Sequence, residues 1–571
     1  MISLSIAVVG SGGAGSITAG NMLLEASAKS GSYGIMTRSV GPQIRGGEAA
    51  ALVRLSAEPI ECISDRYDIF LAMDWKNIDR FSAEIPLDQN SIIIADPDQG
   101  EIPEVIAGSK ARVKEIPIGK LAKSVKKGRP NMIALGILGE ILSIPRESII
   151  EVLNKQLGSK GDQVLLTSIE TVDAGMEAAR GFEKHPLPHK KDNGNGNWMI
   201  TGNQATGLGA VKAGIRFVAA YPITPATEVL EWMASVLPGV GGKLVQAEDE
   251  LASVNMIIGA SYGGIPSLTA TSGPGLSLMM EGLGLAVSSE VPIVVVDVMR
   301  VGPSTGIATK AEQSDLNIAL YGFHGDAPHI VLAPTSIADC IYTAQWSVYL
   351  AESLQIPVIF LSDQYLGQAI AVIDPPVEMK MKTERMVAQQ SENKFLRYEV
   401  TESGISAMAI PGTPGNQYTA DGLEHTPAGA PSTRAEDHEL QMEKRQRKVD
   451  LFDYGENWAE VAGDGDLAII TWGSTTCAVR EAIQRLSAEG ITNIRLVAIR
   501  LLAPAQVKKF ESAMQGVSRA LIIEQSHSGQ FYRYLCANYD LPAQIEVFKR
   551  AGPLLIQPGE IVEKIRNWSK S

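Results

Sequence analysis

The apolar positions of the chain fall into short runs that are separated by helical stretches and glycine turns. At the N-terminus an apolar run at 3–9 leads into a glycine turn, a helical stretch to about residue 28 and a second apolar run at 33–38. Strand, glycine turn, helix and strand in that order are typical of the opening of a doubly wound sheet. Further apolar runs at FVAAYPI, PSLTATS, VPIVVVDVM, IPVIFLSD and DLAIITWGS predict additional strands. The pattern therefore predicts a multidomain α/β protein.

Two stretches interrupt the pattern and divide the chain. Residues 181–197 are polar, rich in proline and glycine and without periodicity, which predicts a linker. Residues 376–455 contain GTPGNQYTADGLEHTPAGAP and then the charged run EDHELQMEKRQRKVD, which predicts a connecting arm with one exposed helix. The sequence thus predicts α/β domains at 1–180, 198–375 and 456–571.

Composition narrows the class of protein. A chain of 571 residues is too long for a single core, and its net charge of −14 argues against a nucleic-acid-binding face. No uninterrupted apolar stretch of about 18 residues occurs, so no membrane span is expected. The four cysteines, at positions 62, 340, 477 and 536, lack the local spacing of zinc ribbons or iron–sulfur clusters, so no metal is expected on this chain. Cysteines without a paired framework also fit a cytoplasmic protein.

A glycine-rich turn follows the first apolar run. It reads GSGGAG, and its backbone amides are suited to cradle a phosphate at a helix N-terminus: Gly10, Gly12, Gly13 and Gly15. A dinucleotide site also needs an acidic residue at the end of the second strand, but that strand ends in Arg38. A phosphate or coenzyme A site that includes Arg45 and a purely structural turn both remain open.

The segment YPITP ends a predicted strand and precedes a helical stretch. Its two prolines fix the backbone on either side of Thr224, whose hydroxyl either points outward or simply caps the helix. Downstream, Glu248, Asp249 and Glu250 precede another helix. Acids at a helix start are ordinary capping, but Glu250 falls where the pattern becomes apolar, and a buried carboxylate is costly unless it is paired or protonated.

Two Gly-Pro turns follow at strand ends. The first is SGPGLS, and the second is RVGPSTGIATK, which carries Arg300 and Lys310. Basic side chains beside such turns are candidates for binding a carboxylate, although either could be solvated surface. His324, in YGFHGDAP, is a candidate base, a phosphate contact or an ordinary turn residue.

Taken in order, these motifs resemble a known family. AYPITP, QAEDELA, ATSGPGLSLMMEG, RVGPSTGIATKAEQSDL, HGDAP and GTPGNQYTADGLEH are similar to the alpha subunit of the 2-oxoacid:ferredoxin oxidoreductases. The region from GSGGAG to RGGEAA resembles the separate gamma subunit of that family, fused here in front. The resemblance implies a gamma-type Rossmann-like domain, a thiamine-diphosphate domain that binds the pyrimidine and a transketolase C-terminal-like domain.

The resemblance also implies roles for individual residues. Glu250 matches the glutamate that hydrogen-bonds N1′ of thiamine diphosphate and favours the tautomer that removes the C2 proton. Thr224 matches the threonine that binds the substrate, and Arg300 and Lys310 lie where the family places the cation for a substrate carboxylate. The expected substrate-binding residues also include Tyr221, Pro222 and Ile223, and the expected cofactor contacts include Gly273, Pro274 and Gly275.

Features that the sequence lacks point to a partner. The family carries its diphosphate- and Mg²⁺-binding GDG motif and its [4Fe-4S] cluster on a beta subunit. The GDG at 463–465 here precedes an apolar run instead of following one, so it does not match that motif. We therefore expect a beta subunit in an (alpha-beta)₂ complex, with coenzyme A as co-substrate and ferredoxin as electron acceptor.

The fused domain order and the ATK segment at 308–310 are closer to members that use 2-oxoglutarate than to those that use pyruvate. We expect conversion of 2-oxoglutarate to succinyl-CoA, reversible as reductive carboxylation. The alternatives are a pyruvate or broad-specificity subunit, a flavin or NAD oxidoreductase that uses the N-terminal glycine turn, and a non-catalytic scaffolding subunit.

Overall fold

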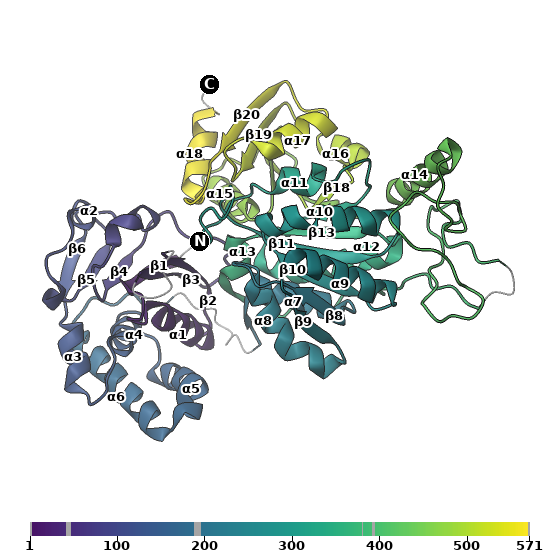
Figure 1. Cartoon of the computed structure of the whole chain (residues 1–571). Helices are drawn as coiled ribbons and strands as arrows, with labels where there is room; N and C mark the ends of the chain where they lie inside the picture. The colour runs from purple at the N-terminus through teal and green to yellow at the C-terminus, as the bar shows by residue number, and fades with distance from the viewer. Residues whose placement is uncertain (1–2, 42–46, 188–195, 380, 391–393, 569–571) are drawn as a thin grey trace. The chain divides into compact units, whose positions relative to one another are not determined.

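A computed structural model describes residues 3–41, 47–187, 196–379, 381–390 and 394–568 (Figure 1). The chain forms two compact units. Unit 1 contains Met1–Thr201, Gln368–Pro376 and Ile556–Ser571, and unit 2 contains Gly202–Gly367 and Val377–Leu555. Among the described helices, none combines the length and the apolar character that crossing a membrane requires.

Unit 1 is built on an eight-stranded mixed sheet in the order β6-β5-β4-β1-β3-β2-β14-β7. The strands are β1 Ser3–Ser11, β2 Tyr33–Val40, β3 Glu48–Ser56, β4 Ile69–Ala72, β5 Ile92–Ala95, β6 Arg112–Glu115, β7 Trp198–Thr201 and β14 Ile370–Ile373. The expected strand, turn, helix and strand are present, but β3 lies between β1 and β2 and is antiparallel to both. The end of β2 is therefore not beside the glycine turn as it is in a dinucleotide-binding sheet.

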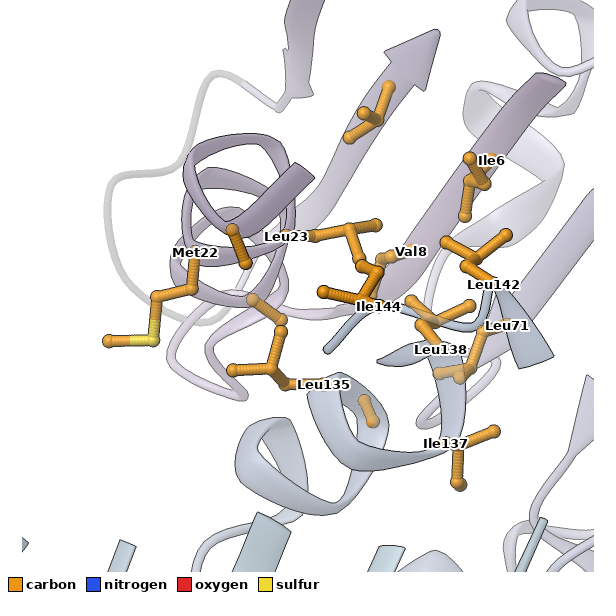
Figure 2. Packing of buried hydrophobic residues seen from close by; sticks show 14 of the residues in the cluster. Ile6, Val8, Met22, Leu23, Leu71, Leu135, Ile137, Leu138, Leu142 and Ile144 are labelled. Carbon is orange, nitrogen blue, oxygen red and sulfur yellow. The ribbon is translucent and has the colours of Figure 1, made fainter. Parts of the chain in front are cut away.

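Helices bury the apolar face of this sheet. On one face they are α1 Ser16–Lys29, α3 Ile118–Ser124, α4 Pro130–Ile141, α5 Arg146–Leu157 and α6 Asp162–Ala178. Helix α2 Glu104–Ala107 packs on the other face, and α18 Pro558–Trp568 is the last helix of unit 1. Figure 2 shows Leu23 of α1 and Leu138 of α4 against Val8 of β1, and all three are fully buried. Each such side chain contributes about 1.5–3 kcal/mol on burial. This core explains why α4 is apolar, because its side chains pack against the sheet and α1.

Unit 2 contains a seven-stranded sheet in the order β18-β12-β13-β11-β10-β8-β9. Its strands are β8 Phe217–Ala220, β9 Lys243–Gln246, β10 Ser267–Thr271, β11 Ile293–Met299, β12 Ile330–Leu332, β13 Pro357–Asp363 and β18 Leu501–Ala503. All neighbouring pairs are parallel except β12 with β18. The central strands β10, β11 and β13 are buried along their whole length, as parallel strands covered on both faces are.

The helices of this part of unit 2 are α7 Gly202–Lys212, α8 Thr227–Val236, α9 Glu250–Tyr262, α10 Gly273–Ser288, α11 Leu316–Tyr321, α12 Ile337–Leu354 and α13 Gln364–Gln368. The range expected for the pyrimidine-binding domain, 198–375, thus includes every strand of this sheet except β18, together with β7 and β14, which pair in the sheet of unit 1.

A second sheet of unit 2 has the order β15-β17-β16-β19-β20. It consists of β15 Ala459–Ala462, β16 Leu467–Trp472, β17 Ile494–Ile499, β19 Arg519–Glu524 and β20 Gln544–Lys549, with helices α15 Thr475–Ala488, α16 Val507–Ala513 and α17 Gln530–Asn538. Gly463, Asp464 and Gly465 lie in the turn between β15 and β16, and no helix follows them there. The turn therefore lacks the strand–GDG–helix order of a diphosphate site.

The arm at 376–455 ends in α14, Ala435–Asp450. The sequence predicted an exposed helix, but one face of α14 is buried, and Lys444 and Lys448 lie on that face. Both ammonium groups contact the carboxylate of Glu290, at 2.5 and 3.1 Å. The prediction of an exposed helix therefore holds for only one face of α14, because the buried carboxylate of Glu290 pairs with cations on the other face.

Candidate functional site

The candidate site lies at the carboxyl edge of the parallel sheet in unit 2. The segments 221–225, 247–250, 272–275 and 300–303 follow β8, β9, β10 and β11 respectively. Since neighbouring parallel strands end at the same edge, these segments are brought together there, where α/β sheets generally bind their ligands. Motifs that are separated by up to about 80 residues in sequence therefore share one region.

Glu250 is the first residue of α9, and its side chain is buried. Asp249 is the N-cap and accepts a hydrogen bond from the amide of Ala252 at 2.7 Å, so capping is carried out by the neighbour of Glu250. No donor to the Glu250 carboxylate is found among the described residues. A Cβ at Gly275 would lie 2.6 Å from Glu250 Oε1. The glycine therefore leaves room for a buried acid whose hydrogen-bonding capacity is available to a ligand.

Thr224 lies in the segment after β8, and the structure removes one of the two roles left open for it, that of helix cap. Helix α8 begins at Thr227 with Ala226 at the N-cap, so Thr224 is not the cap. Its side chain is exposed, and its carbonyl accepts a hydrogen bond from Arg300 Nη1 at 2.7 Å. The threonine segment and the end of β11 are thus fixed to each other.

Arg300 is buried, and two carboxyl groups act on it, those of Asp297 and Asp315. Burial lowers the pKa of the guanidinium, and the two acids partly oppose that shift. Burial also raises the pKa of Asp297, as does the nearby charge of Asp315. For Asp315, burial and then Glu312 raise the pKa to about 6. The site is therefore an electrostatically coupled group and not an isolated cation.

A pocket of about 810 Å³ opens beside these residues. Gly273, Pro274 and Arg300 line it from the parallel sheet, and His527, Ser528 and Gln530 line it from the C-terminal sheet. Gln530 joins the two sides, since its Nε2 donates to the carbonyl of Ser314 at 2.7 Å and its Oε1 accepts from the amide of Asn317 at 2.8 Å. A pocket of this size accommodates a small organic substrate or part of a cofactor.

The other predicted residues lie at varying positions relative to this pocket. Tyr221 is 42% exposed, and Pro222 and Ile223 are half-buried. Lys310 does not line the 810 Å³ pocket, and its carbonyl accepts the amide of Val301 at 3.0 Å. His324 lines a different pocket of about 360 Å³, together with Glu281, Asp326, His438 and Arg445. The sequence alone treated Arg300 and Lys310 alike, whereas only Arg300 lines the larger pocket.

The N-terminal glycine turn lies in unit 1. Gly15 has φ +92°, and a Cβ there would lie 2.5 Å from Asn131 Nδ2, so close packing against α4 demands glycine. Gly13 has φ +103° and no atom within 4 Å of a Cβ position, so the backbone conformation, and not packing, favours glycine there. Gly10 and Gly12 flank the end of β1, and Arg45 lies outside the described residues. The geometry gives these glycines structural reasons and leaves a ligand at the turn as a prediction.

Among the residues of this region that sequence reasoning missed are Asp297, Asp315, His527 and Ser528. Asp297 is a charged residue inside the apolar run IVVVDVM, and a charge at such a position signals function or pairing. The other three stand in ordinary polar loops, and only the tertiary structure brings them to the pocket.

Family models match two parts of the chain. The model described as "Pyruvate flavodoxin/ferredoxin oxidoreductase, thiamine diP-bdg" matches residues 208–444, which include the sheet edge described above. The model described as "Pyruvate ferredoxin/flavodoxin oxidoreductase" matches residues 5–178 in unit 1. Fold, site and matches together define a class of oxidoreductase with a thiamine-diphosphate-binding domain.

Individual relatives narrow this class. The chain is 33% identical to "2-oxoglutarate synthase subunit KorA" of Methanothermobacter marburgensis, over 64% of this chain and 98% of that protein. It is 32% identical to "2-oxoacid:ferredoxin oxidoreductase subunit alpha" of Saccharolobus solfataricus, over 78% of this chain and 73% of that protein. A solved structure of 2-oxoglutarate:ferredoxin oxidoreductase from Magnetococcus marinus, with 2-oxoglutarate, coenzyme A and succinyl-CoA bound, is 38% identical with a TM-score of 0.91 over 99% of both chains. The chain belongs to the 2-oxoacid:ferredoxin oxidoreductase family, as an alpha subunit with a gamma-type domain at its N-terminus.

Proposed function

We propose that this chain is the alpha subunit of an enzyme that converts 2-oxoglutarate and coenzyme A to succinyl-CoA and carbon dioxide. Two electrons pass to ferredoxin, and the reaction is reversible as a reductive carboxylation. The observation that carries the proposal is the convergence of Glu250, Thr224 and Arg300 on one sheet edge beside an 810 Å³ pocket. The 38% identity to a 2-oxoglutarate:ferredoxin oxidoreductase over nearly the whole chain supports the choice of substrate.

The residues at the sheet edge fit thiamine diphosphate. Glu250 is a buried carboxylate to which no described residue donates a hydrogen bond, and the lack of a side chain at Gly275 gives that carboxylate its room. An aminopyrimidine ring offers this carboxylate the partner that a buried acid needs. When bound, the cofactor supplies an electron sink for decarboxylation of a 2-oxoacid. Glu250 would hold a proton at N1′, and Gly273 and Pro274 would border the cofactor at the start of α10.

Arg300 and Thr224 would orient the substrate. The guanidinium is buried beside the pocket and keeps its charge, so it can bind the carboxylate next to the oxo group. The hydroxyl of Thr224 would donate to the same end of the substrate.

A second carboxylate distinguishes 2-oxoglutarate from pyruvate. A pocket for a dianion needs a second cation, because burying an unpaired carboxylate costs at least a few kcal/mol. Lys310, on the loop that follows Arg300, is our candidate for the distal carboxylate. Pyruvate or broad 2-oxoacid specificity is the alternative if the second cation has another role.

A beta subunit would complete the enzyme. The GDG segment of this chain forms a turn between two strands, so the diphosphate, Mg²⁺ and the [4Fe-4S] cluster are assigned to that partner. We propose an (alpha-beta)₂ complex. The N-terminal glycine turn, together with Arg45, is our candidate for binding a phosphate group of coenzyme A.

The experiment is to co-express the chain with its beta subunit and to measure coenzyme A-dependent viologen reduction with 2-oxoglutarate, pyruvate and 2-oxobutyrate. We expect the highest kcat/KM for 2-oxoglutarate. A higher value for pyruvate would favour the broad-specificity alternative, and a complex that assembles but oxidises none of the three would refute the proposal.

A further inference from the structure

The outer side of helix α9 is apolar, although it faces solvent. Leu251 and Met256 are 48% and 42% exposed, and Asn255 and Gly259 are the other exposed residues of the helix. Within α9, which the structure describes from end to end, no exposed side chain carries a charge. The amide of Asn255 is turned back onto the helix, where its Nδ2 donates to the carbonyl of Leu251 at 2.9 Å. The outer side of α9 therefore offers water almost no polar side chain.

Helix α5 has the pattern that is normal for a solvated helix of similar length. Its exposed residues are mostly charged: Arg146, Glu147, Glu151, Asn154 and Lys155. A surface helix ordinarily directs charged residues outward and apolar residues inward, whereas a helix that is apolar on both sides is normally buried on both. The outer side of α9 is therefore the kind of surface that another protein chain covers.

Helix α10 continues this surface. It packs directly on α9, because a Cβ at Gly282 would lie 2.7 Å from Val254 Cγ1. Helix α9 also packs against β8 and β10, and α10 against β10 and β11, so the two helices cover the sheet side by side. Leu278 of α10 is 51% exposed, and the one charged residue of that helix is Glu281. We call the exposed residues of both helices the α9–α10 face: Leu251, Asn255, Met256, Gly259, Ser277, Leu278 and Glu281.

The α9–α10 face begins at the candidate site. Leu251 directly follows Glu250, and Ser277 lines the 810 Å³ pocket. Under the proposed function, Glu250 holds the aminopyrimidine end of thiamine diphosphate, whereas the described residues contain no strand–GDG–helix segment for the diphosphate end. A partner that supplies this segment must come within one cofactor length of Glu250. It therefore has to cover the surface that surrounds this end of α9 and α10.

We propose that the α9–α10 face is the docking surface for the beta subunit and that the same subunit supplies the diphosphate-binding segment. This inference rests on the proposed function for the identity of the partner, and the relatives that are named as alpha subunits support the existence of one. The partner's surface is apolar opposite Leu251, Met256 and Leu278, because side chains of this kind gain free energy when an apolar surface removes them from water.

Met256 provides a test that needs no substitution. Peroxide oxidises an accessible methionine to the sulfoxide, and burial protects the thioether. Met256 should be oxidised in the purified chain, and its rate should fall by roughly tenfold or more in the complex with the beta subunit. Met386, which lies in the arm and is more exposed, is the internal control and should react equally fast in both. Mass spectrometry of the peptides measures the two rates.

A charge on the α9–α10 face should oppose assembly. Met256→Arg should weaken binding of the beta subunit by roughly 30-fold or more, because it places an unpaired guanidinium in an apolar interface. Leu440→Arg is the matched control, since Leu440 is similarly exposed but lies between Glu436 and Glu443 on the exposed side of α14. Light scattering over a dilution series measures the dissociation of each co-expressed complex. Thermal unfolding of each chain alone should match wild type, because both substituted side chains are exposed.

The outcomes separate the docking surface from the proposed function. An active complex in which Met256 stays as reactive as in the free chain would overturn the inference alone, and so would a Met256→Arg complex as stable as that of Leu440→Arg. A dimer of the chain alone in which Met256 is protected would also overturn it, because a second copy would then occupy the face. A complex that assembles with Met256 protected but oxidises no 2-oxoacid would support the docking surface and overturn the proposed function.

Discussion

Glu250 is the residue whose removal tests the proposed chemistry most directly. Glu250→Gln keeps the shape of the side chain but removes the proton that N1′ of the cofactor requires. We expect kcat to fall by roughly 10²–10⁴, as for the loss of a positioned acid or base. Viologen reduction by the complex measures the effect, and gel filtration shows whether the complex still assembles.

The matched control is Glu248→Gln, two residues earlier in the same acidic segment. Glu248 is exposed, whereas Glu250 is buried, so the control makes the same chemical change outside the site. Its kcat should stay within about twofold of wild type. Near wild-type turnover of Glu250→Gln would show that the proton role belongs to another group.

Replacement of Lys310 tests whether 2-oxoglutarate is the preferred substrate. Lys310→Met should raise KM for 2-oxoglutarate by roughly 10–100-fold, because the distal carboxylate loses its cation. Use of 2-oxobutyrate, which has no distal charge, should change little. The measured quantity is the ratio of kcat/KM for the two substrates. An unchanged ratio removes Lys310 from the distal site, and an equal loss for both means that it binds the carboxylate they share.

At the scale of elements, the first turn of α10 packs between two acids. Gly273 faces Asp315 and Gly275 faces Glu250, both with the hypothetical Cβ 2.6 Å from a carboxylate oxygen. In Gly275→Ala the added methyl group also meets Thr271 Oγ1 at 2.1 Å. We expect a loss of about 1–3 kcal/mol in the free energy of unfolding, together with a lower kcat because Glu250 is displaced.

Gly259→Ala is the matched control for this substitution. Gly259 lies in α9, and no atom comes within 4 Å of a Cβ there. Because alanine restricts the unfolded chain and favours a helix, the control should stabilise the chain by about 0.5–1 kcal/mol. Urea unfolding of the two variants gives the comparison, and equal destabilisation by both would contradict the packing argument.

Helix α14 is joined to the rest of unit 2 by buried charges. Burial alone would raise the pKa of Glu290, but Lys448, Lys444 and Arg397 outweigh it and lower that pKa well below its ordinary value of 4.5. Glu290→Gln would leave these cations buried without a counter-charge. It should therefore lower the free energy of unfolding by about 3–5 kcal/mol at neutral pH.

The sign of the pH effect follows from the lowered pKa. The contribution of Glu290 is present above the pKa of the unfolded chain and is lost as pH falls through the pKa of the folded state. The difference between wild type and Glu290→Gln should thus shrink in acid. Glu443→Gln, on the exposed face of the same helix, is the control and should change stability by less than about 0.5 kcal/mol.

At the scale of the whole molecule, we propose that the chain supplies one half of an active site. We expect the purified chain to be colourless and to bind thiamine diphosphate weakly, because the diphosphate and the cluster are assigned to the beta subunit. Co-expression should yield a brown (alpha-beta)₂ complex with coenzyme A-dependent activity. Absorption spectra, calorimetric titration with the cofactor and light scattering measure these properties. A fully active, iron-free preparation of the chain alone would contradict this division.

The sequence by itself determined most of the local elements and supplied the candidate site residues, whose roles stay a prediction. The buried strands β10, β11 and β13 are continuous apolar runs, so composition and length identify them without knowledge of their partners. Glu250, Thr224 and Arg300 stand in long ordered motifs at strand ends, where the direction of a parallel sheet predicts that they meet.

Only the tertiary structure decided the contacts between segments that are distant in sequence. The insertion of β3 between β1 and β2 and the pairing of β18 with β12 depend on which edge is free in space, and local periodicity carries no record of that. Local periodicity likewise carries no record of which charged side chains lie close together. Asp297 and Asp315 are 18 residues apart, and Glu290 and Lys444 are 154 apart. Their electrostatic interactions follow from burial in a shared environment, which exists only when the sheets and the arm are packed together.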